Sequence, residues 1–397
     1  MRQYYNMILK YATWERGFLM KKYIIAGLAA VCCVTLCSCG KNARQLNNTG
    51  IEYYNASQYE KAADTFLQAA EKDKDGSAEY YANLGKTYIE LGQYDKAGEA
   101  FVNALSNVTD DKTALWGMGV VSYYTGDYAS SMEYFGRIVD NISDYDDTDI
   151  DSLQYYASLQ SYYNDCAGAI DSYTVLIRKK HNIAQQYFLR GSIYASQKME
   201  NEAVLDYEEA LKTYGDDYEM YYNIYYSLHQ AGFEDRAVSY LRRALEIDGA
   251  DNLLKGKTYY IINDYDNAQK YLSKAIDDGS REAEFYLAMT YEKLGKNEEA
   301  VELYSSYIKN YPADAKAYNQ YGMYFMNKGD YTSALEYFSA GLALGSDEAK
   351  RELMFNQACC YEYLHQYAMA YDKFGEYLKV YPEDVAATHE YDFLSSR

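Results

Sequence analysis

Small and large apolar residues return along this chain in one fixed frame. A small residue recurs at intervals of 31 to 38 positions. Its ten occurrences are Ala62, Ala97, Ser131, Ala169, Ala203, Ala237, Ala268, Ala300, Ala334 and Ala370. Four residues after each comes a large apolar or aromatic residue, such as Phe66 or Phe101. Around these positions, apolar residues follow the i, i+3, i+4, i+7 recurrence of an amphipathic helix, so the pattern predicts an all-α chain.

A second set of small residues indicates that each frame holds two helices. Gly or Ala stands twelve residues before nine of the ten small positions, and Tyr225 replaces it in the sixth frame. The nine are Gly50, Gly85, Gly119, Ala157, Gly191, Gly256, Ala288, Gly322 and Ala358. A glycine between the two halves at Gly92, Gly126, Gly232, Gly295 and Gly329 predicts the turn of an antiparallel helix pair. Small residues on both helices let the backbones approach closely, and the large residue one turn later fills the groove.

This frame resembles the tetratricopeptide repeat, a 34-residue helix–turn–helix unit with small and aromatic residues at these positions. The two prolines of the chain, Pro312 and Pro382, stand twelve residues after Ala300 and Ala370, where the family also favours proline. The resemblance covers residues 43–382. It implies a right-handed superhelical solenoid of about ten repeats, whose first helices line a concave face. Residues 383–397 are expected to form a polar capping helix and tail.

Three departures from the regular frame lead to local predictions. The interval of 38 between Ser131 and Ala169 predicts a longer loop around residues 143–151. The interval of 31 before Ala268 predicts a shortened helix near residues 249–253. Tyr225 in place of a small residue predicts that the sixth helix pair packs slightly farther apart.

The N-terminal residues are set apart from the repeats as a targeting segment. Residues 1–19 are interpreted as a start-site extension, with Met20 as the preferred true start. Lys21 and Lys22 precede an apolar run over residues 24–36, which is too short to span a bilayer comfortably and is typical of a signal peptide.

The end of this leader, Leu36-Cys37-Ser38-Cys39-Gly40, resembles a bacterial lipobox. The resemblance implies a lipoprotein signal peptide over residues 20–38, a diacylglycerol on Cys39 and a lipidated tether over residues 39–42. The alternative is an ordinary secretory signal followed by a free cysteine. The leader therefore predicts an exported protein, anchored by lipid to the outer face of a bacterial cell membrane.

Charge and cysteine content narrow the choice of partners. The formal charge of −21 argues against nucleic acid, because so acidic a chain repels phosphates. Attachment to a membrane would rest on the acyl chains at Cys39. After the leader and the lipid site, the chain contains only three cysteines, Cys166, Cys359 and Cys360. Three scattered cysteines do not form a disulfide framework. The adjacent Cys359 and Cys360 are expected to be small buried residues.

Aromatic residues occupy many positions that the resemblance places on the concave face. They offer a large contact area at low entropy cost, which suits peptide recognition. The candidates for ligand binding are Trp116, Tyr123, Tyr124, Tyr162, Phe188, Tyr222, Tyr226, His229, Tyr260 and Phe285, and Phe355 and Tyr363 continue the row. For each tyrosine, packing between helices with the hydroxyl at the rim is the alternative role. Trp116 is the only tryptophan after the leader.

Motifs for catalysis or metal binding are missing from the sequence. The four histidines are far apart, and there is no HExxH, no CxxC pair and no glycine-rich phosphate loop. The loop with Asp144, Asp146 and Asp147 lacks the glycine of a dedicated calcium site, which favours a solvated loop. The Lys and Asn residues with which some tetratricopeptide domains grip C-terminal carboxylates are also missing. We therefore expect no cofactor, no metal and no enzymatic activity.

These observations lead to two hypotheses of different classes. The first is a membrane-anchored, extracytoplasmic scaffold, expected as a monomer, that binds a peptide segment of another envelope protein in its concave groove. The second is a lipoprotein that binds cell-wall glycans or solutes by stacking its tyrosines on sugar rings.

Overall fold

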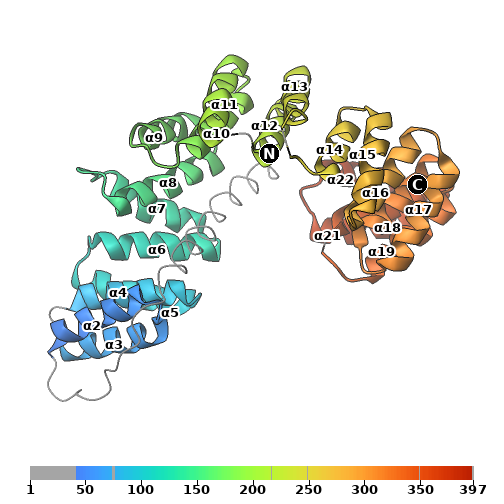
Figure 1. Ribbon diagram of the computed structural model, residues 1–397. Helices are drawn as coiled ribbons and strands as arrows, with labels where there is room; N and C mark the ends of the chain where they lie inside the picture. Colours follow the sequence, from blue (N-terminus) through green and yellow to red (C-terminus); the bar gives the residue numbers. More distant parts are fainter. Residues whose placement is uncertain (1–41, 74–76, 216, 248, 348, 396–397) are drawn as a thin grey trace. The chain divides into compact units, whose positions relative to one another are not determined.

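The computed structural model describes residues 42–73, 77–215, 217–247, 249–347 and 349–395. Within these ranges every regular element is an α-helix, which confirms the all-α prediction. The chain divides into two compact units, Met1–Tyr240 and Leu241–Arg397 (Figure 1). The predicted signal peptide and the lipid site at Cys39 lie outside the described residues.

In the described ranges the helices form ten consecutive pairs followed by a single helix, so the predicted helical repeat solenoid is confirmed. The first helices of the pairs are α2 (Ala43–Asn55), α4 (Ser77–Glu90), α6 (Lys112–Thr125), α8 (Asp147–Tyr162), α10 (Ile183–Ser196), α12 (Tyr218–Gln230), α14 (Asn252–Ile261), α16 (Arg281–Lys293), α18 (Ala315–Asn327) and α20 (Lys350–Tyr363). The second helices are α3 (Tyr59–Lys72), α5 (Tyr94–Asn107), α7 (Tyr128–Val139), α9 (Cys166–Arg178), α11 (Glu200–Tyr214), α13 (Glu234–Ala244), α15 (Tyr265–Asp277), α17 (Asn297–Asn310), α19 (Tyr331–Ala343) and α21 (Tyr367–Val380). The last helix is α22 (Val385–Ser395).

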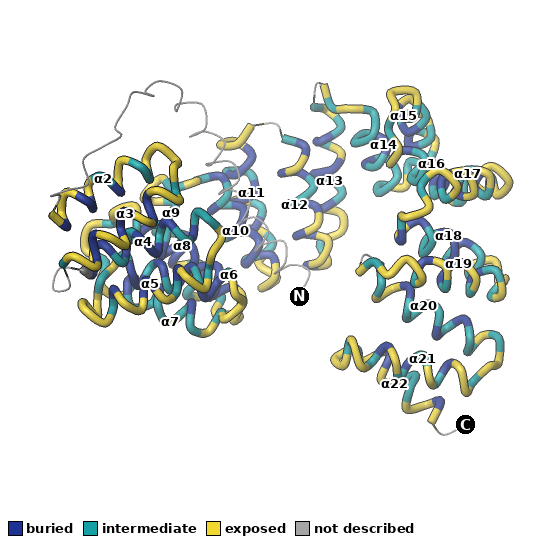
Figure 2. Tube along the Cα trace, turned by 90° about the horizontal axis from the view of Figure 1, so that it is seen from below, coloured by how far each residue is buried: buried dark blue, intermediate teal, exposed yellow. Residues whose placement is uncertain are grey.

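The recurring small residues lie where these helices meet. Most second helices pack on their own first helix and on the first helix of the next pair, as α3 does on α2 and α4. All ten small residues of the frame are fully buried at 0% exposure, and none of their large partners exceeds 1%. Buried positions accordingly recur along the helices of both units (Figure 2). The frame read from the sequence is therefore the packing frame of the fold.

Glycines of the first helices make room for rings of the second helices. A Cβ atom added to Gly50 would lie 2.6 Å from the ring of Phe66. The ring of Phe101 is enclosed from two sides: a Cβ would lie 2.6 Å from it at Gly85 and 2.1 Å at Gly117. The predicted close approach of the two helices is confirmed, with the aromatic ring seated on the glycine of the partner helix.

A residue in the left-handed conformation marks the turn within each pair. The five predicted turn glycines have φ between 68° and 85°. The other five turns place a non-glycine residue there, with φ between 56° and 64°: Ser57, Asn164, Lys198, Asn263 and His365. That conformation costs a non-glycine residue roughly 1–2 kcal/mol. Glycine therefore identifies five of these turns in the sequence. The other five could be predicted only from the regular spacing of the repeats.

The two irregular intervals are accommodated differently. Between α7 and α8 the loop runs from residue 140 to 146, and α8 has 16 residues, so the extra length divides between loop and helix. The longer loop is confirmed, but it ends earlier than predicted. Helix α14 begins at Asn252 and has 10 residues, which confirms the shortened helix. The wider packing expected at Tyr225 stays a prediction.

A buried ion pair joins the helices of the fifth pair. Arg190 on α10 donates from Nε and Nη2 to the two carboxylate oxygens of Asp206 on α11, at 2.8 and 2.7 Å. Its Nη1 donates to Thr174 Oγ1 on α9 at 2.8 Å. The two charged side chains are only 16% and 7% exposed. Rings of Tyr187 and Tyr194 lie 5.5 and 6.0 Å from the guanidinium carbon, so aromatic and polar groups together enclose the cation.

A carboxylate at the start of α22 ties this helix to the tenth pair. Asp384 accepts hydrogen bonds from Arg351 Nη2 at 2.6 Å and from Tyr377 Oη at 2.7 Å. Its other oxygen caps the helix by accepting from the backbone amide of Ala387 at 3.2 Å. Arg351 and then Tyr377 lower the pKa of Asp384 to about 2. Val385, the first residue of α22, is 82% exposed.

Acidification is expected to loosen α22 between about pH 4 and pH 2. The pKa of Asp384 is depressed in the folded state, from the roughly 3.9 of an unfolded chain. Its stabilising contribution is therefore complete above the unfolded value and is lost as the pH falls through the folded one. Hydrogen-exchange protection factors of residues 385–395, measured from pH 5 to pH 2, would check this. In Asp384→Asn the amide keeps the helix cap but cannot titrate, so the pH dependence should disappear.

Candidate functional site

The first helices line one face within each compact unit. Adjacent first helices contact each other, as α2 with α4, α4 with α6 and α6 with α8 in one unit, and α14 with α16 and α18 with α20 in the other. In the described part of the chain, adjacent second helices make no contact of comparable extent. A stack that is closer on one side bends towards that side, so the first helices lie on the inner face of each unit. The right-handed superhelix stays a prediction.

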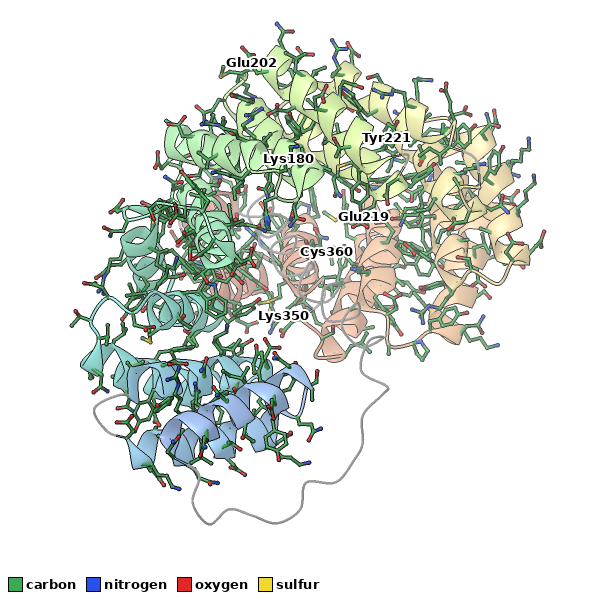
Figure 3. The ribbon with its side chains drawn as sticks, turned by 60° about the vertical axis from the view of Figure 1, so that its left-hand side comes forward. Lys180, Glu202, Glu219, Tyr221, Lys350 and Cys360 are labelled. Carbon is green, nitrogen blue, oxygen red and sulfur yellow. The ribbon has the colours of Figure 1, made fainter. Side chains whose placement is uncertain are left out.

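Helix α12 carries the densest row of aromatic side chains on this face. Tyr218, Tyr222 and Tyr226 are spaced four residues apart and therefore share one stripe of the helix. Their ring centroids follow each other at 5.7 and 6.2 Å. Tyr226 is 43% exposed, whereas Tyr221 is buried with its ring 6.5 Å from that of Tyr240 (Figure 3). The three residues are here called the α12 row (Tyr218, Tyr222 and Tyr226). Tyr218 is buried at the start of the row, and accessibility rises through the half-buried Tyr222 to Tyr226.

His229 and Asn223 add polar groups beside the α12 row. The His229 ring stacks on Tyr225 at 5.4 Å, and its Nδ1 pairs with Glu234. Asn223, on the same helix, has a buried Nδ2 without a hydrogen-bond partner among the described residues. A buried donor left unpaired costs about 1–3 kcal/mol, and this nitrogen has no exposed surface through which a ligand could reach it. The sequence analysis missed Asn223, because no motif distinguishes it from other helical asparagines.

Trp116 is held in place by the neighbouring first helices. Its indole Nε1 donates to Asp151 Oδ2 on α8 at 2.5 Å. On the other side, Lys86 Nζ of α4 lies 5.9 Å from the ring centroid. The half-buried ring therefore connects three consecutive first helices and keeps part of its surface accessible.

Tyr124 and Tyr162 lie next to the turns within their pairs, at the ends of α6 and α8. Tyr124 stacks on Tyr94 of α5, with centroids 5.3 Å apart and an interplanar angle of 14°. Tyr162 packs on Tyr128 of α7 at 4.9 Å. Both predicted residues thus belong to an aromatic edge that the second helices complete.

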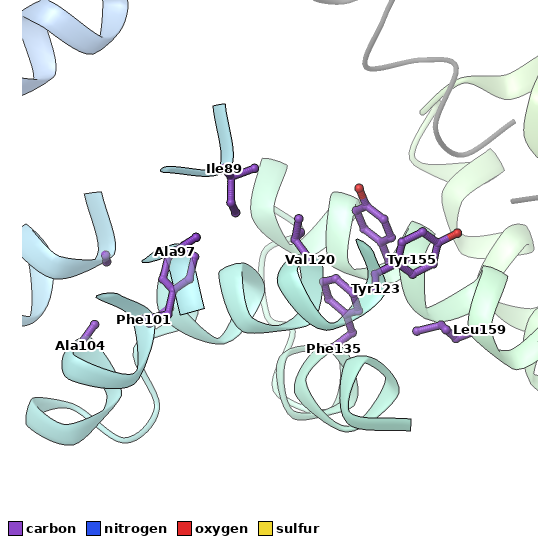
Figure 4. Packing of buried hydrophobic residues seen from close by; sticks show 11 residues of the cluster. Ile89, Ala97, Phe101, Ala104, Val120, Tyr123, Phe135, Tyr155 and Leu159 are labelled. Atoms are coloured by element: carbon purple, nitrogen blue, oxygen red, sulfur yellow. The ribbon is translucent and has the colours of Figure 1, made fainter. Parts of the chain in front are cut away.

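Two of the predicted ligand-binding residues are corrected, because their side chains are buried. Phe188 is 1% exposed, and its ring lies 5.9 Å from that of Tyr207. Tyr123 is 4% exposed, and its ring lies 5.0 Å from that of Tyr155 (Figure 4). At both places the first helix of the next pair packs on the first helix that carries the residue, which closes the ring off from a ligand.

Replacing Tyr123 by phenylalanine is expected to leave stability unchanged or to raise it by up to about 1 kcal/mol. The Tyr123 hydroxyl is buried with no hydrogen-bond partner in the described chain, and burial raises its pKa. Removing an unsatisfied polar group relieves its desolvation penalty. Tyr207→Phe is the matched control, because the Tyr207 hydroxyl pairs with Ser227 Oγ at 2.6 Å, and it should cost about 1–2 kcal/mol. Equal losses in chemical denaturation of the two variants would contradict this account of Tyr123.

The remaining candidates lie in the second compact unit and are half-buried. Tyr260 has its ring 6.2 Å from that of Tyr286, and burial first, then Tyr265, raises its pKa to about 12. The ring of Phe285 lies 6.4 Å from that of Tyr304. These contacts show the packing role that was left open for such residues, and ligand contact by either one stays a prediction. Phe355 packs likewise on Phe374 at 5.6 Å, while Tyr363 is 53% exposed and stacks on Tyr331 at 4.6 Å.

Asparagine pairs between successive first helices form a second polar feature that the sequence analysis missed. Asn83 Nδ2 donates to Asn47 Oδ1 at 3.0 Å, and Asn47 Nδ2 donates to Glu79 at 2.7 Å. In the second unit, Asn356 Nδ2 donates to Asn319 Oδ1 at 3.0 Å. The separations of 36 and 37 residues match one repeat, which is the signal that could have revealed both pairs.

Metal-ligand clusters and cysteine thiols are two kinds of chemical group that such a chain can offer. The described residues hold no group of three or more His, Cys, Asp or Glu side chains arranged for a metal ion. Asp146, considered above for calcium, instead caps α8 and pairs with Lys112. Burial raises the pKa of both Cys359 and Cys360 to about 12, so neither thiol is an activated nucleophile (Cys360 in Figure 3). A helix with the length and apolarity to cross a bilayer was found nowhere in the described ranges.

Comparison with family models identifies the repeats. Residues 253–315, 287–349, 78–107 and 184–217 match two models that are both described as tetratricopeptide repeat. A search of curated proteins gave no significant match.

Solved structures with a similar fold include three chains of low identity, two of which are described as tetratricopeptide repeat proteins. Yeast Tom70 shares 16% identity over 89% of this chain and 88% of its own, with a TM-score of 0.43. A tetratricopeptide repeat protein from Parabacteroides merdae shares 15% over 63% of this chain and 99% of its own, with a TM-score of 0.44. YrrB, described as a TPR protein with an unusual peptide-binding site, shares 18% over 47% of this chain and 93% of its own, with a TM-score of 0.41. Likeness at this level carries no information on function.

The matched repeats, placed in ten helix pairs with buried small residues at the predicted positions, identify the chain as a tetratricopeptide repeat protein. Proteins of this family are generally non-enzymatic scaffolds that present an extended surface to protein partners.

Proposed function

We propose that this protein is a membrane-anchored, extracytoplasmic scaffold that binds a peptide segment of another envelope protein along its first helices. The observation that carries the peptide-binding part is the α12 row, in which Tyr222 is half-buried and Tyr226 is 43% exposed. Accessible rings supply the contact area for a bound segment. Export and lipid anchoring are supported by the leader sequence and its lipobox-like end at Cys39.

Charge near the α12 row favours a ligand with basic as well as apolar residues. Glu219 and Glu234 are exposed close to the two ends of α12, in a chain with a formal charge of −21. Complementary charge speeds the encounter and selects the partner, while desolvated rings supply most of the affinity.

Peptides selected on the purified full chain from a random display library would test the groove. A selected peptide should bind at least about tenfold more weakly to Tyr222→Ala and Tyr226→Ala, since central aromatic residues carry about 2 kcal/mol or more each. Tyr214→Ala is the matched control, because Tyr214 is 47% exposed at the end of a second helix. Equal binding of all three variants would overturn the assignment of the α12 row.

The same variants distinguish the glycan hypothesis. Stacked, accessible tyrosines also suit sugar rings, so purified cell-wall fragments should be titrated in parallel with the selected peptide. Saturable binding of the fragments, lost in Tyr226→Ala while no peptide is selected, would replace the peptide proposal by the glycan one.

The anchoring part has its own test, in bacteria that express the wild type and Cys39→Ala. Lipid mass on a chain beginning at Cys39, together with membrane fractionation that is lost in the variant, is the expected result. A soluble, unprocessed chain in both strains would remove the envelope from the proposal and leave the groove proposal intact.

A further inference from the structure

We propose that this protein has a second binding surface, at the turns of the second to fourth helix pairs, which takes a segment rich in lysine or arginine from a partner protein. This surface, here called the tyrosine edge, consists of six residues. They are Tyr94, Tyr124, Tyr123, Tyr128, Tyr162 and Tyr163. It is separate from the α12 row, which lies along the first helix of the sixth pair.

The rings of the tyrosine edge contact one another in an unbroken series. Five successive contacts have centroid distances between 4.9 and 5.8 Å: Tyr94 to Tyr124, Tyr124 to Tyr123, Tyr123 to Tyr128, Tyr128 to Tyr162 and Tyr162 to Tyr163. Tyr123 lies beneath the surface, while Tyr162 and Tyr163 are 37% and 47% exposed. Because each ring is positioned by its neighbours, the accessible faces are held in place before any ligand arrives.

The charge around these rings is negative. The turn segments 90–96, 123–128 and 162–168 contain four acidic residues and a single basic one, Lys96, whose Nζ lies 5.6 Å from the centroid of the Tyr88 ring. The acidic residues are Glu90, Asp95, Asp127 and Asp165. Asp127 helps to raise the pKa of Tyr163, after burial and Tyr162, so its carboxylate lies within electrostatic range of the most exposed ring.

Helix capping alone does not account for this surface. Asp127 accepts from the backbone amide of Ser130 at 3.1 Å, and Asp165 accepts from that of Gly168 at 3.0 Å, so both carboxylates cap second helices. An asparagine would cap as well, and a cap gives no reason for exposed, stacked tyrosines beside it. The combination of aromatic faces and uncompensated carboxylates is the chemistry that binds cations.

A protein segment with alternating basic residues fits the geometry of the edge. In an extended chain, side chains on one face recur about every 6.6 Å. Contacting rings of the edge lie 4.9 to 5.8 Å apart, and the long, flexible side chains of lysine and arginine can span the difference. Lysine or arginine at alternate positions could therefore place one cation on each accessible ring and near one carboxylate. Nucleic acid would be repelled by the same carboxylates, and a neutral glycan would gain nothing from them.

The test uses the full chain and an acetylated octapeptide of alternating arginine and serine, followed by fluorescence anisotropy at low salt. Saturable binding is expected, with an affinity that falls as salt is added. The combined variant Tyr162→Ala/Tyr163→Ala should weaken binding at least about tenfold, and Asp127→Asn/Asp165→Asn at least about fivefold. A peptide with citrulline in place of arginine should not bind.

Matched controls separate this surface from general charge attraction and from the α12 row. Asp111→Asn changes one charge at the opposite end of α6 and keeps its cap, where Asp111 accepts from Ala114 at 2.8 Å, so binding should be unchanged. Tyr226→Ala should also leave octapeptide binding unchanged, even where it abolishes binding of a selected groove peptide. No saturable binding, binding of the citrulline peptide, or an equal loss in Asp111→Asn would each overturn the tyrosine edge without touching the proposed groove.

Discussion

Gly117→Ala is expected to destabilise the third helix pair by about 3 kcal/mol, at the upper end of what overpacking usually costs. The new Cβ would lie 2.1, 2.3 and 2.4 Å from three carbons of the Phe101 ring. The ring cannot move away, because Gly85 on its other side already leaves no room for a Cβ, which would lie 2.6 Å from it. Hydrogen exchange should report the loss of protection in α4 to α7, since repeat units pass strain mainly to their neighbours.

Gly98→Ala is the control for this experiment. It adds the same methyl group to α5, where the nearest side-chain atom is Val121 Cγ1 at 3.7 Å, an ordinary contact. Alanine inside a helix is favoured over glycine by roughly 0.5–1 kcal/mol, so this variant should be slightly more stable than the wild type. If both variants had the same free energy of unfolding as the wild type, the close packing of Phe101 between Gly85 and Gly117 would not contribute to stability.

Arg190→Ala is expected to cost about 3–5 kcal/mol, because it leaves the Asp206 carboxylate buried without its partner. Chemical denaturation, together with exchange protection in α9 to α11, would measure this loss. The backbone of α10 is not at issue, since alanine is a good helix former.

The double variant Arg190→Met/Asp206→Leu shows whether the ion pair or the volume matters. Replacing both partners by apolar residues of similar size removes the uncompensated charge and should recover most of the lost stability. A double variant as unstable as Arg190→Ala would mean that the guanidinium's contacts with Thr174, Tyr187 and Tyr194 matter more than its charge pair.

The repeat frame could be predicted because one-dimensional spacing carries it. Small residues such as Ala97 must recur wherever two helices touch, and large ones such as Phe101 must follow one turn later. Five of the ten turns could also be predicted, because a glycine stands at each of them. Glycine adopts the left-handed conformation without strain, whereas Ser57 and His365 adopt it at an energetic cost. The split of the extra residues between the α7–α8 loop and α8 depended on the capping by Asp146, which the spacing does not contain.

The candidate site could be predicted only in part, because exposure depends on how far the next helix closes over a residue. Tyr222 and Phe188 both stand on first helices at equivalent positions, yet one is half-buried and accessible and the other is covered. The bond from Trp116 to Asp151 joins residues 35 apart, and predicting it would require knowing how two helices cross. The tyrosine edge was divided between predicted first-helix residues and unpredicted second-helix partners such as Tyr128.

Contacts confined to adjacent helices also determine how this chain would respond to a pulling force. The extensive helix contacts in the described chain join successive helices or the first helices of neighbouring pairs, so one pair can open while those beyond its neighbours keep their own packing. Each opened pair of some 34 residues would release about 12 nm of extended chain. Stretched between two attachment points, the protein would lengthen in a series of small yielding steps and refold as the load fell, as an elastic tether does.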